Sequence, residues 1–509
     1  MPRQAKADFR ETVRIPLVVT ANNRIFTQAG LGSLAATGIV GSGIVGSMIV
    51  GKLYTATDDQ KFVNCFPEKI VNPLTGKEMY YITKRPGFET HTTPSSGNAG
   101  TAIRLWLGQG SGDKVISAFG STNSTIYDGT SSIGTLTGCA RDITETNATA
   151  TATLVIPCEN GNAYYYPTGG AMTQITDVDF PSTNIGTFVH MDGYAFIMTS
   201  AGDIYNSDLN SIANWTSTSF ISAQASTDKG IGLVRYRNIV VAFGKETCEM
   251  FWNAGNPSGS PLSRLDQGSF KLGAISSRSI CSLEDNIYWV SSTDSGSYAV
   301  YTMDGFSPKR ISTPVIESQI AALGPSGNID VSGFRLLGRT FIIVMVGGPS
   351  TFVYSVEDNI WHEWTGTRIW HKFTGNTATT NSIYSISRDS SSGKVYKILP
   401  TALVFTDDSS NYTMTLQTTK FDASNNKYKF LDKLDLVGDV QDAATAITLA
   451  WSDDDYGTWS DEYSLDLANA DNFVTGLGAF RRRAFRLTNT SSTPVRLEAL
   501  ELEYRQGTH

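Results

Sequence analysis

Residues 334–364 read FRLLGRTFIIVMVGGPSTFVYSVEDNIWHEW, a stretch in which strand-like apolar runs alternate with short polar turns. Val, Ile, Phe, Tyr and Trp favour extended backbone, whereas Gly, Asn, Asp and Ser favour turns. The stretch therefore predicts a small antiparallel sheet. Six further units have the same pattern of strands and turns but different residues. They begin at Ile103, Ala152, Thr187, Gly232, Arg278 and Ser382.

The spacing of these units predicts the architecture. Seven units share about 300 residues between Thr101 and Pro400, a spacing in the forties that is typical of four-stranded propeller blades. Radial stacking covers both faces of each sheet and leaves only short edges exposed. We predict an all-β fold with a β-propeller of six or seven blades. A pair of two-sheet sandwiches is the structural alternative.

The composition and the length of the predicted strands change on both sides of these units. We expect an N-terminal segment at residues 1–57 that contains a Gly-rich apolar arm, and a propeller at 58–403. Longer alternating strands at 404–509 predict a C-terminal β-sandwich-like domain.

The last of these strands has apolar residues on both of its faces. Val495 and Leu497 lie on one face, whereas Leu502 and Tyr504 lie on the other, because side chains alternate along a strand. We therefore expect a β-bulge or an interface there.

Composition excludes several classes of function. The chain has 509 residues and 47 glycines, which fits short strands and tight turns. Its formal net charge of −8 disfavours tight nucleic-acid binding, because such binding needs Lys and Arg side chains that contact the phosphates. The five cysteines are odd in number and lack a CxxC pair, which predicts neither a disulfide framework nor a zinc site and fits a reducing compartment. The charged N-terminus does not resemble a signal peptide.

The segment from Ile25 to Gly51 contains no charged residue and is long enough to cross a bilayer. Its small apolar residues are diluted by Gly, Ser and Thr, so its hydrophobicity is marginal, and its Gly-xxx-Gly spacings suit close backbone packing. We interpret residues 29–50 as an extended or buried arm between subunits. A membrane-active segment and a disordered segment are the alternatives.

We find no catalytic, cofactor-binding or metal-binding motif in the sequence. The five histidines have no nucleophile motif such as G-x-S-x-G, and no H-E-x-x-H, EF-hand loop or phosphate loop is present. Glycan hydrolysis would need two carboxylates across a cleft. The acidic cluster at 452–456 is better explained by turn formation and solubility.

Two short patterns resemble the Asp-box hairpins of sialidase-like propellers. One combines Ser207 and Asp208 with Trp215, and the other combines Ser452 with Asp454, Gly457 and Trp459. Because Asp boxes stabilise turns far from catalytic centres, they support hairpins and say almost nothing about activity.

A basic cluster lies inside the strand-like run FRRRAFRL at 480–487. A strand would place guanidinium groups on both faces, where they are rarely buried unpaired. One interpretation is surface pairing with local Asp and Glu. The functional hypothesis is docking onto an acidic patch of a neighbouring subunit, or a transient phosphate contact. The candidate partner-docking residues are Arg481, Arg482, Arg483 and Arg486.

Three stretches resemble a known family. They are DDQKFVNCFPEKIVNPLTGKEMYYITKRPGFET at 58–90, the block at 233–291 that begins LVRYRNIVVAFGKETCEMFW, and KLDLVGDV together with FRRRAFRLTNTSSTPVRLEALELE near the C-terminus. Together they resemble the packaged-DNA stabilisation proteins of short-tailed bacteriophages, also called tail nozzle or tail hub proteins. The middle block, with Phe243, Gly244 and the strand at 249–252, carries most of the similarity. Residues 29–50 depart from the family pattern.

The resemblance implies a structural virion protein of the tail and not an enzyme. It implies a six-fold ring that continues the DNA channel below the portal and adaptor, retains packaged DNA, and carries attachment sites. The implied partners are further copies in a hexamer, tail adaptor proteins, and tail spike, fibre or needle proteins. DNA would pass without sequence-specific binding, and an acidic channel wall would let it slide. Assembly would take place in the host cytoplasm.

The alternative function is a tail-associated glycan hydrolase or depolymerase on a propeller scaffold. The structural hypothesis predicts no cleft with converging titratable groups, and it predicts a large flank that is buried only in an oligomer.

Overall fold

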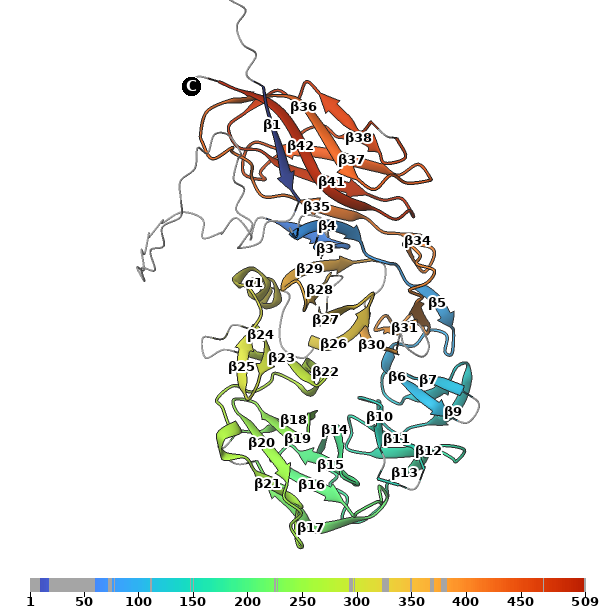
Figure 1. Cartoon of the computed structure of the whole chain (residues 1–509). Coiled ribbons are helices and arrows are strands. Elements are labelled where there is room, and N and C mark those ends of the chain that lie inside the picture. The colour runs from blue at the N-terminus through green and yellow to red at the C-terminus, as the bar shows by residue number, and fades with distance from the viewer. Residues whose placement is uncertain are drawn as a thin grey trace, which may run out of the picture. The chain divides into compact units, whose positions relative to one another are not determined.

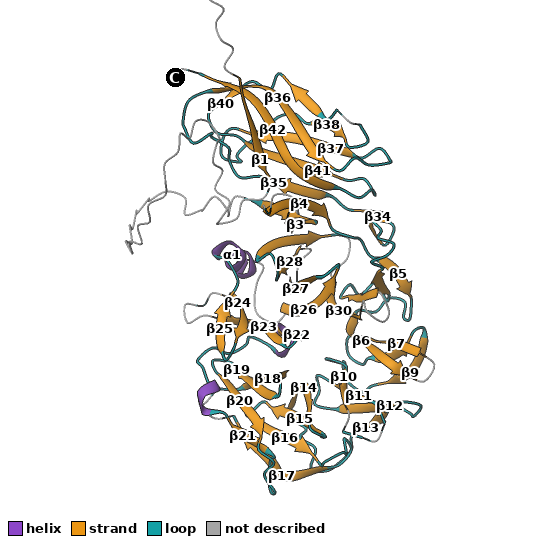
Figure 2. Ribbon diagram, viewed as in Figure 1, coloured by secondary structure: helices purple, strands orange, loops and turns teal. Residues whose placement is uncertain are grey.

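The computed structural model of the protein describes residues 10–17, 60–71, 76 and 78–507, apart from gaps at 110–111, 147, 150, 224–225, 227, 293–295, 297, 323–328, 348–349, 367–369, 377–381 and 470. The chain is all-β and has two compact units (Figure 2). One unit is Pro86–Ser410, and the other combines the residues up to Arg85 with Asn411–His509.

Unit Pro86–Ser410 is a β-propeller built from four-stranded antiparallel sheets. Within its described residues, five four-stranded sheets each use four consecutive strands, and a further one combines β30–β32 with β5. Strands β26–β29 pair in order and form the remaining blade. The first three consecutive sheets are β6 (Gly100–Gln109), β7 (Gly112–Phe119), β8 (Thr125–Asp128) and β9 (Ser131–Thr135); β10 (Thr144–Thr146), β11 (Thr153–Pro157), β12 (Ala163–Pro167) and β13 (Thr173–Gln174); and β14 (Asn184–Met191), β15 (Tyr194–Thr199), β16 (Asp203–Ser207) and β17 (Trp215–Ser222).

The next three sheets are β18 (Gly230–Tyr236), β19 (Ile239–Gly244), β20 (Cys248–Asn253) and β21 (Leu262–Arg264); β22 (Ile280–Leu283), β23 (Asn286–Ser292), β24 (Tyr298–Asp304) and β25 (Ser307–Arg310); and β26 (Ile329–Leu336), β27 (Arg339–Val346), β28 (Ser350–Ser355) and β29 (Ile360–Thr365). The closing sheet contains β30 (Trp370–Asn376), β31 (Ser382–Ser387), β32 (Val395–Ile398) and β5 (Glu89–Thr92). Short helices η1 (Asp266–Gly268), η2 (Ser277–Ser279) and α1 (Pro314–Ala322) lie between strands.

The closing sheet joins the two ends of the propeller. Thr90 of β5 is paired with Tyr396 of β32, so an early strand completes the last blade. The innermost strands β10, β14, β18, β22, β26, β30 and β6 contact one another in this order around the axis. An apolar cluster between the β6–β9 and β10–β13 sheets links the remaining two blades. Figure 1 shows the blades as a ring. Each recurring unit of the sequence corresponds to one of these sheets, which confirms the propeller prediction.

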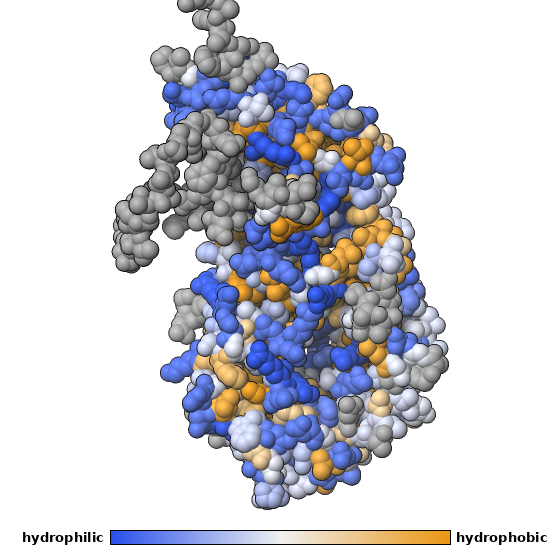
Figure 3. All heavy atoms as spheres, in the orientation of Figure 1, coloured by the Kyte–Doolittle hydropathy of each residue, from blue (hydrophilic) through white to orange (hydrophobic). Residues whose placement is uncertain are grey.

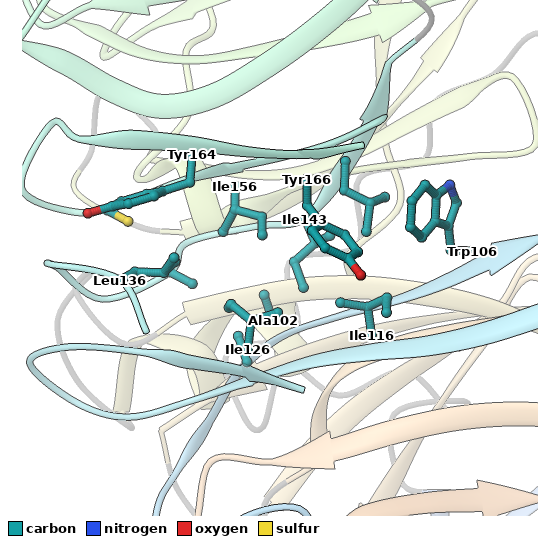
Figure 4. Packing of buried hydrophobic residues seen from close by; sticks show 13 residues of the cluster. Ala102, Trp106, Ile116, Ile126, Leu136, Ile143, Ile156, Tyr164 and Tyr166 are labelled. Carbon is teal, nitrogen blue, oxygen red and sulfur yellow. The ribbon is translucent and has the colours of Figure 1, made fainter. Parts of the chain in front are cut away.

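Apolar clusters between neighbouring blades hold the ring together. One cluster joins the β6–β9 sheet to the β10–β13 sheet, and Figure 4 shows Trp106, Ile126 and Tyr166 packed within it. A stacked pair, Phe334 and Phe373 at 4.8 Å, lies between β26 and β30. Strand β27, seven of whose eight residues are buried, is apolar on both faces because a blade lies on each side. Burial of both faces explains the unbroken apolar run FIIVMV.

The second unit contains two antiparallel sheets, in agreement with the predicted sandwich-like class. One follows the order β3-β4-β42-β36-β39, with β1 on β42 and β40 on β36, and the other follows β2-β35-β41-β37-β38. The strands are β1 (Arg10–Pro16), β2 (Lys61–Val63), β3 (Cys65–Val71), β4 (Glu78–Lys84), β35 (Met414–Gln417), β36 (Lys429–Gly438), β37 (Ala446–Ser452), β38 (Tyr463–Asp466), β39 (Phe473–Thr475), β40 (Ala479–Phe480), β41 (Ala484–Asn489) and β42 (Arg496–Gln506). A hairpin of β33 (Thr406–Asp407) and β34 (Ser410–Asn411) lies at the boundary.

Of the two alternatives predicted for the last strand, a β-bulge and an interface, the structure shows a β-bulge. The register between β36 and β42 shifts between Leu431 and Lys433, and again between Val437 and Gly438. Ala499 and Leu500 of β42 are consecutive and both buried, so apolar neighbours cover both faces there.

The structure divides the chain at other residues than the predicted 57/58 and 403/404 boundaries. Strands β2–β4 belong to the C-terminal unit because they pair with its strands: Ile82 lies opposite Leu497, and the buried Lys84 Nζ donates to Asn489 Oδ1 at 2.8 Å. The proposed arm at 29–50 lies outside the described residues. Among the described helices, none is long and apolar enough to cross a membrane.

Candidate functional site

The basic cluster lies on the connection between β40 and β41. Arg481 and Arg482 form a bend and not part of a strand, which corrects the prediction for these two positions. Arg483 makes an isolated bridge to Phe421, and regular pairing begins only at Ala484. The bend lets neighbouring arginines point in unrelated directions, which strict strand alternation would not permit.

Arg483 is buried and contributes to the interior of this unit. Its guanidinium, 2 % exposed, pairs with Asp453 at 2.7 and 2.8 Å. It also donates to the Leu477 carbonyl at 2.7 Å and lies over the rings of Phe480 and Trp451, at 4.4 and 5.0 Å from their centroids. Two carboxylate bonds, a carbonyl and two rings satisfy this cation, so Arg483 holds the loop in place.

The other three arginines lie at the surface. Arg482 is 52 % exposed and pairs with Asp455 at 3.1 Å. Arg481 lies over the Tyr428 ring at 4.6 Å. Arg486 lies over the Trp459 ring at 4.3 Å. Exposed ion pairs contribute little stability, so these side chains are free to exchange local partners for external ones.

Exposed aromatic residues, which the sequence analysis missed, accompany the surface arginines. Tyr428, Phe430 and Phe473 are half-exposed on or beside β36 and β39. Strand β36 alternates the exposed Phe430 with the buried Leu431, so the alternation in YKFLDKL was the available sequence signal. We call Tyr428, Phe430, Phe473, Arg481 and Arg482 the aromatic–arginine face.

Both Asp-box-like patterns stabilise hairpins, as predicted. In the β37–β38 turn, Asp454 accepts hydrogen bonds from the Thr458 hydroxyl at 2.6 Å, the Thr458 N–H at 2.9 Å and the Ser452 hydroxyl at 2.8 Å. These bonds, those from Thr458 first, lower the pKa of Asp454 to about 2. In the β16–β17 turn, the Thr216 hydroxyl donates to Asp208 at 3.1 Å. The carboxylates therefore serve as turn acceptors.

All five cysteines are free thiols, and burial raises the pKa of each. The pKa of Cys158 and that of Cys281 rise to about 12. Because the thiolate is the reactive form, we expect the folded protein to react negligibly with a thiol reagent at pH 8, and all five thiols to react in denaturant. Thiol titration before and after denaturation measures this, and a fast-reacting thiol in the folded protein would contradict it.

A hollow of about 440 Å³ lies on the propeller axis and contradicts the prediction that no cleft has converging titratable groups. Figure 3 shows hydrophilic residues gathered at the centre of the propeller. We call this hollow the axial pocket. Its charged lining residues are Arg104, Arg141, Arg235, Arg278, Lys372, Asp142 and Glu145. Among the described residues, no group of three or more His, Cys, Asp or Glu side chains could hold a metal ion.

Comparison with family models decides the family. Residues 76–398 match the model described as "Bacteriophage P22 Gp10, beta-propeller". The chain belongs to this family. This match confirms the family that the sequence resembles. Members of the family are structural proteins of bacteriophages. The chain is therefore a bacteriophage structural tail protein and a component of the virion. The match ends before the aromatic–arginine face.

Three solved structures are similar to the chain at low identity. The designed Ika8 protein is 10 % identical with a TM-score of 0.39, over 61 % of this chain and 99 % of that chain. BamB from Moraxella catarrhalis is 10 % identical with a TM-score of 0.36, over 58 % of this chain and 82 % of that chain. Raptor from Chaetomium thermophilum is 12 % identical with a TM-score of 0.40, over 61 % of this chain and 29 % of that chain. No curated protein matches the chain.

Proposed function

We propose that this member of the P22 Gp10 propeller family forms a ring-shaped tail nozzle. The ring, a hexamer, continues the DNA channel below portal and adaptor, retains packaged DNA, and carries attachment sites for tail spikes, fibres or a needle. The observation that carries the proposal is the family match across the propeller. The net charge of −8 supports a wall along which DNA slides. Five free thiols support assembly in the reducing host cytoplasm.

A closed ring needs two different surfaces on each subunit, because head-to-tail contacts repeat around the axis. We propose that the aromatic–arginine face is one of them and docks onto an acidic patch of the neighbouring subunit. Aromatic residues and arginine are the types enriched at interface centres. Arg481 and Arg482 of this face make the contact in this proposal, together with Arg486 on β41, and Arg483 positions the loop that carries Arg481 and Arg482. The arm at 29–50 is a second proposed contact.

Charge reversal at Arg482 tests the docking face. We expect Arg482→Glu to weaken assembly about tenfold, since it places a carboxylate against an acidic partner. The matched control is Arg335→Glu in the propeller, because Arg335 is 56 % exposed and pairs with Glu284 at 3.0 Å. Sedimentation velocity of both variants, with electron microscopy of the wild-type particle, measures the effect.

Equal assembly of the two variants would rule out the docking face. A wild-type protein that remains monomeric at all concentrations would rule out the ring itself. Release of reducing sugar from host polysaccharide by that monomer would support the glycan hydrolase alternative.

A further inference from the structure

The axial pocket concentrates positive charge in an acidic protein. Five cations and two carboxylates line it, which leaves three excess positive charges, whereas the whole chain carries −8. A second hollow of about 460 Å³ shares Arg141, Ser277 and Arg278 with the axial pocket and adds Arg388 and Glu159. The two hollows are therefore contiguous around Arg141 and Arg278. Each volume falls within the roughly 300–1,000 Å³ of small-ligand pockets.

Most carboxylates in or next to these hollows already form ion pairs with particular cations. Glu159 pairs with Arg278 at 2.7 Å. Glu145 lies 3.7 Å from Arg104. The buried Asp330, just behind the lining, pairs with Arg388 at 3.1 Å.

Arg141 has only neutral partners among the hydrogen bonds of the described residues. Its Nη1 donates to the Ile185 carbonyl at 2.9 Å and to the Ser277 hydroxyl at 2.8 Å. Its Nε–H is buried without a hydrogen-bond partner there. Burial lowers the pKa of Arg141, although a guanidinium stays charged in proteins. Two hydrogen bonds hold the guanidinium in place. Glu159 interacts with it electrostatically, but the Glu159 carboxylate is paired with Arg278.

Lys372 adds a second cation from another blade. It lies on β30, next to the buried His371, and lines the same pocket. Asp330 interacts electrostatically with Lys372, but the Asp330 carboxylate is paired with Arg388 at 3.1 Å and lies 3.5 Å from His371. Arg235, from β18, donates to the His190 carbonyl at 3.2 Å, which is again a neutral partner. Cations from separate blades thus converge on one hollow.

We propose that the axial pocket binds a phosphate-bearing ligand, whose oxygens are held by Arg141 and Lys372. Preorganised guanidinium and ammonium groups are the usual recognition groups for phosphate, and arginine offers paired donors. When Arg388, Glu159 and the buried Asp330 are included, six cations face four carboxylates, which leaves two excess positive charges. A doubly charged phosphate group would balance them, which a single carboxylate would not. The ligand is either a free di- or polyphosphate or the phosphate part of a nucleotide. This site lies on the axis of one propeller and is distinct from the channel of the proposed ring.

Isothermal titration calorimetry of the full-length protein tests the proposal with two probes, inorganic pyrophosphate and a deoxynucleoside triphosphate. We expect both to bind and to raise the melting temperature relative to sodium chloride of equal ionic strength. Equal affinity would identify the phosphate alone as the ligand. Tighter binding of the nucleotide would identify a nucleotide site. Absence of binding by both probes would overturn the proposal.

Three variants test whether Arg141 and Lys372 form the binding site. Arg141→Gln and Lys372→Gln should each weaken pyrophosphate binding about tenfold, the effect of losing one charge-assisted hydrogen bond. Lys309→Gln is the control, because Lys309 is exposed on the outer strand β25. Should Arg141→Gln unfold the propeller, Lys372→Gln decides alone, since Lys372 is only half-buried. Equal binding by Lys372→Gln and the control would refute the assignment.

Discussion

Arg483→Ala should destabilise the C-terminal unit by about 3 kcal/mol. The substitution leaves a cavity between the Phe480 and Trp451 rings and removes the donor from the buried Leu477 carbonyl. Cavity formation and a lost buried hydrogen bond each cost on the order of 1–3 kcal/mol. Urea unfolding followed by circular dichroism and tryptophan fluorescence measures the change in the transition of this unit.

The adjacent Arg482 supplies the control for this prediction. Arg482→Ala should change stability by less than about 0.5 kcal/mol, because the side chain is exposed and its pair with Asp455 is screened by solvent. Similar costs for the two substitutions would show that burial of Arg483 does not support the unit. A large cost at Arg483 also means that charge reversal there cannot test docking, which leaves Arg482 as the informative position.

Gly393→Ala should destabilise the propeller by about 2–5 kcal/mol, since a left-handed backbone and overpacking each add roughly 1–3 kcal/mol. Gly393 has φ +59°, and an added Cβ would lie 1.3 Å from the Ser95 carbonyl oxygen. The Ser95 N–H donates to the Gly393 carbonyl at 3.2 Å, and the Gly393 N–H donates to Asn98 at 3.0 Å. These bonds join the turn after β5 to the closing blade, so the clash opens the ring where its ends meet.

Gly305→Ala separates the clash from the backbone effect. Gly305 has φ +63°, close to that of Gly393, but an added Cβ would meet no atom within 4 Å. We expect this control to cost only about 1–2 kcal/mol, the penalty for a left-handed residue. Calorimetry of both variants gives the comparison. If the two substitutions cost the same, the close approach to Ser95 does not contribute to closure.

The candidate site was only partly predictable. The run of arginines at 481–483 identified the loop, but one of its members is buried and its neighbour is exposed. That difference arises from the bend before β41 and from Asp453, which is contributed by a loop thirty positions away. The axial pocket left no sequence signal, because Arg141 and Lys372 belong to blades that are distant along the chain.

The amino-acid sequence by itself determined the all-β class, the recurring four-stranded units and the turn role of Asp454, because strand alternation and turn chemistry act over a few residues. The tertiary structure alone decided that β5 completes the last blade, that β2–β4 join the C-terminal unit, and which arginine is buried. These outcomes depend on partners such as Lys84 and Asn489, which lie 405 positions apart. Strand edges and buried charges pair with complementary groups that only the folded chain brings close to them. A local sequence pattern therefore does not predict these partners.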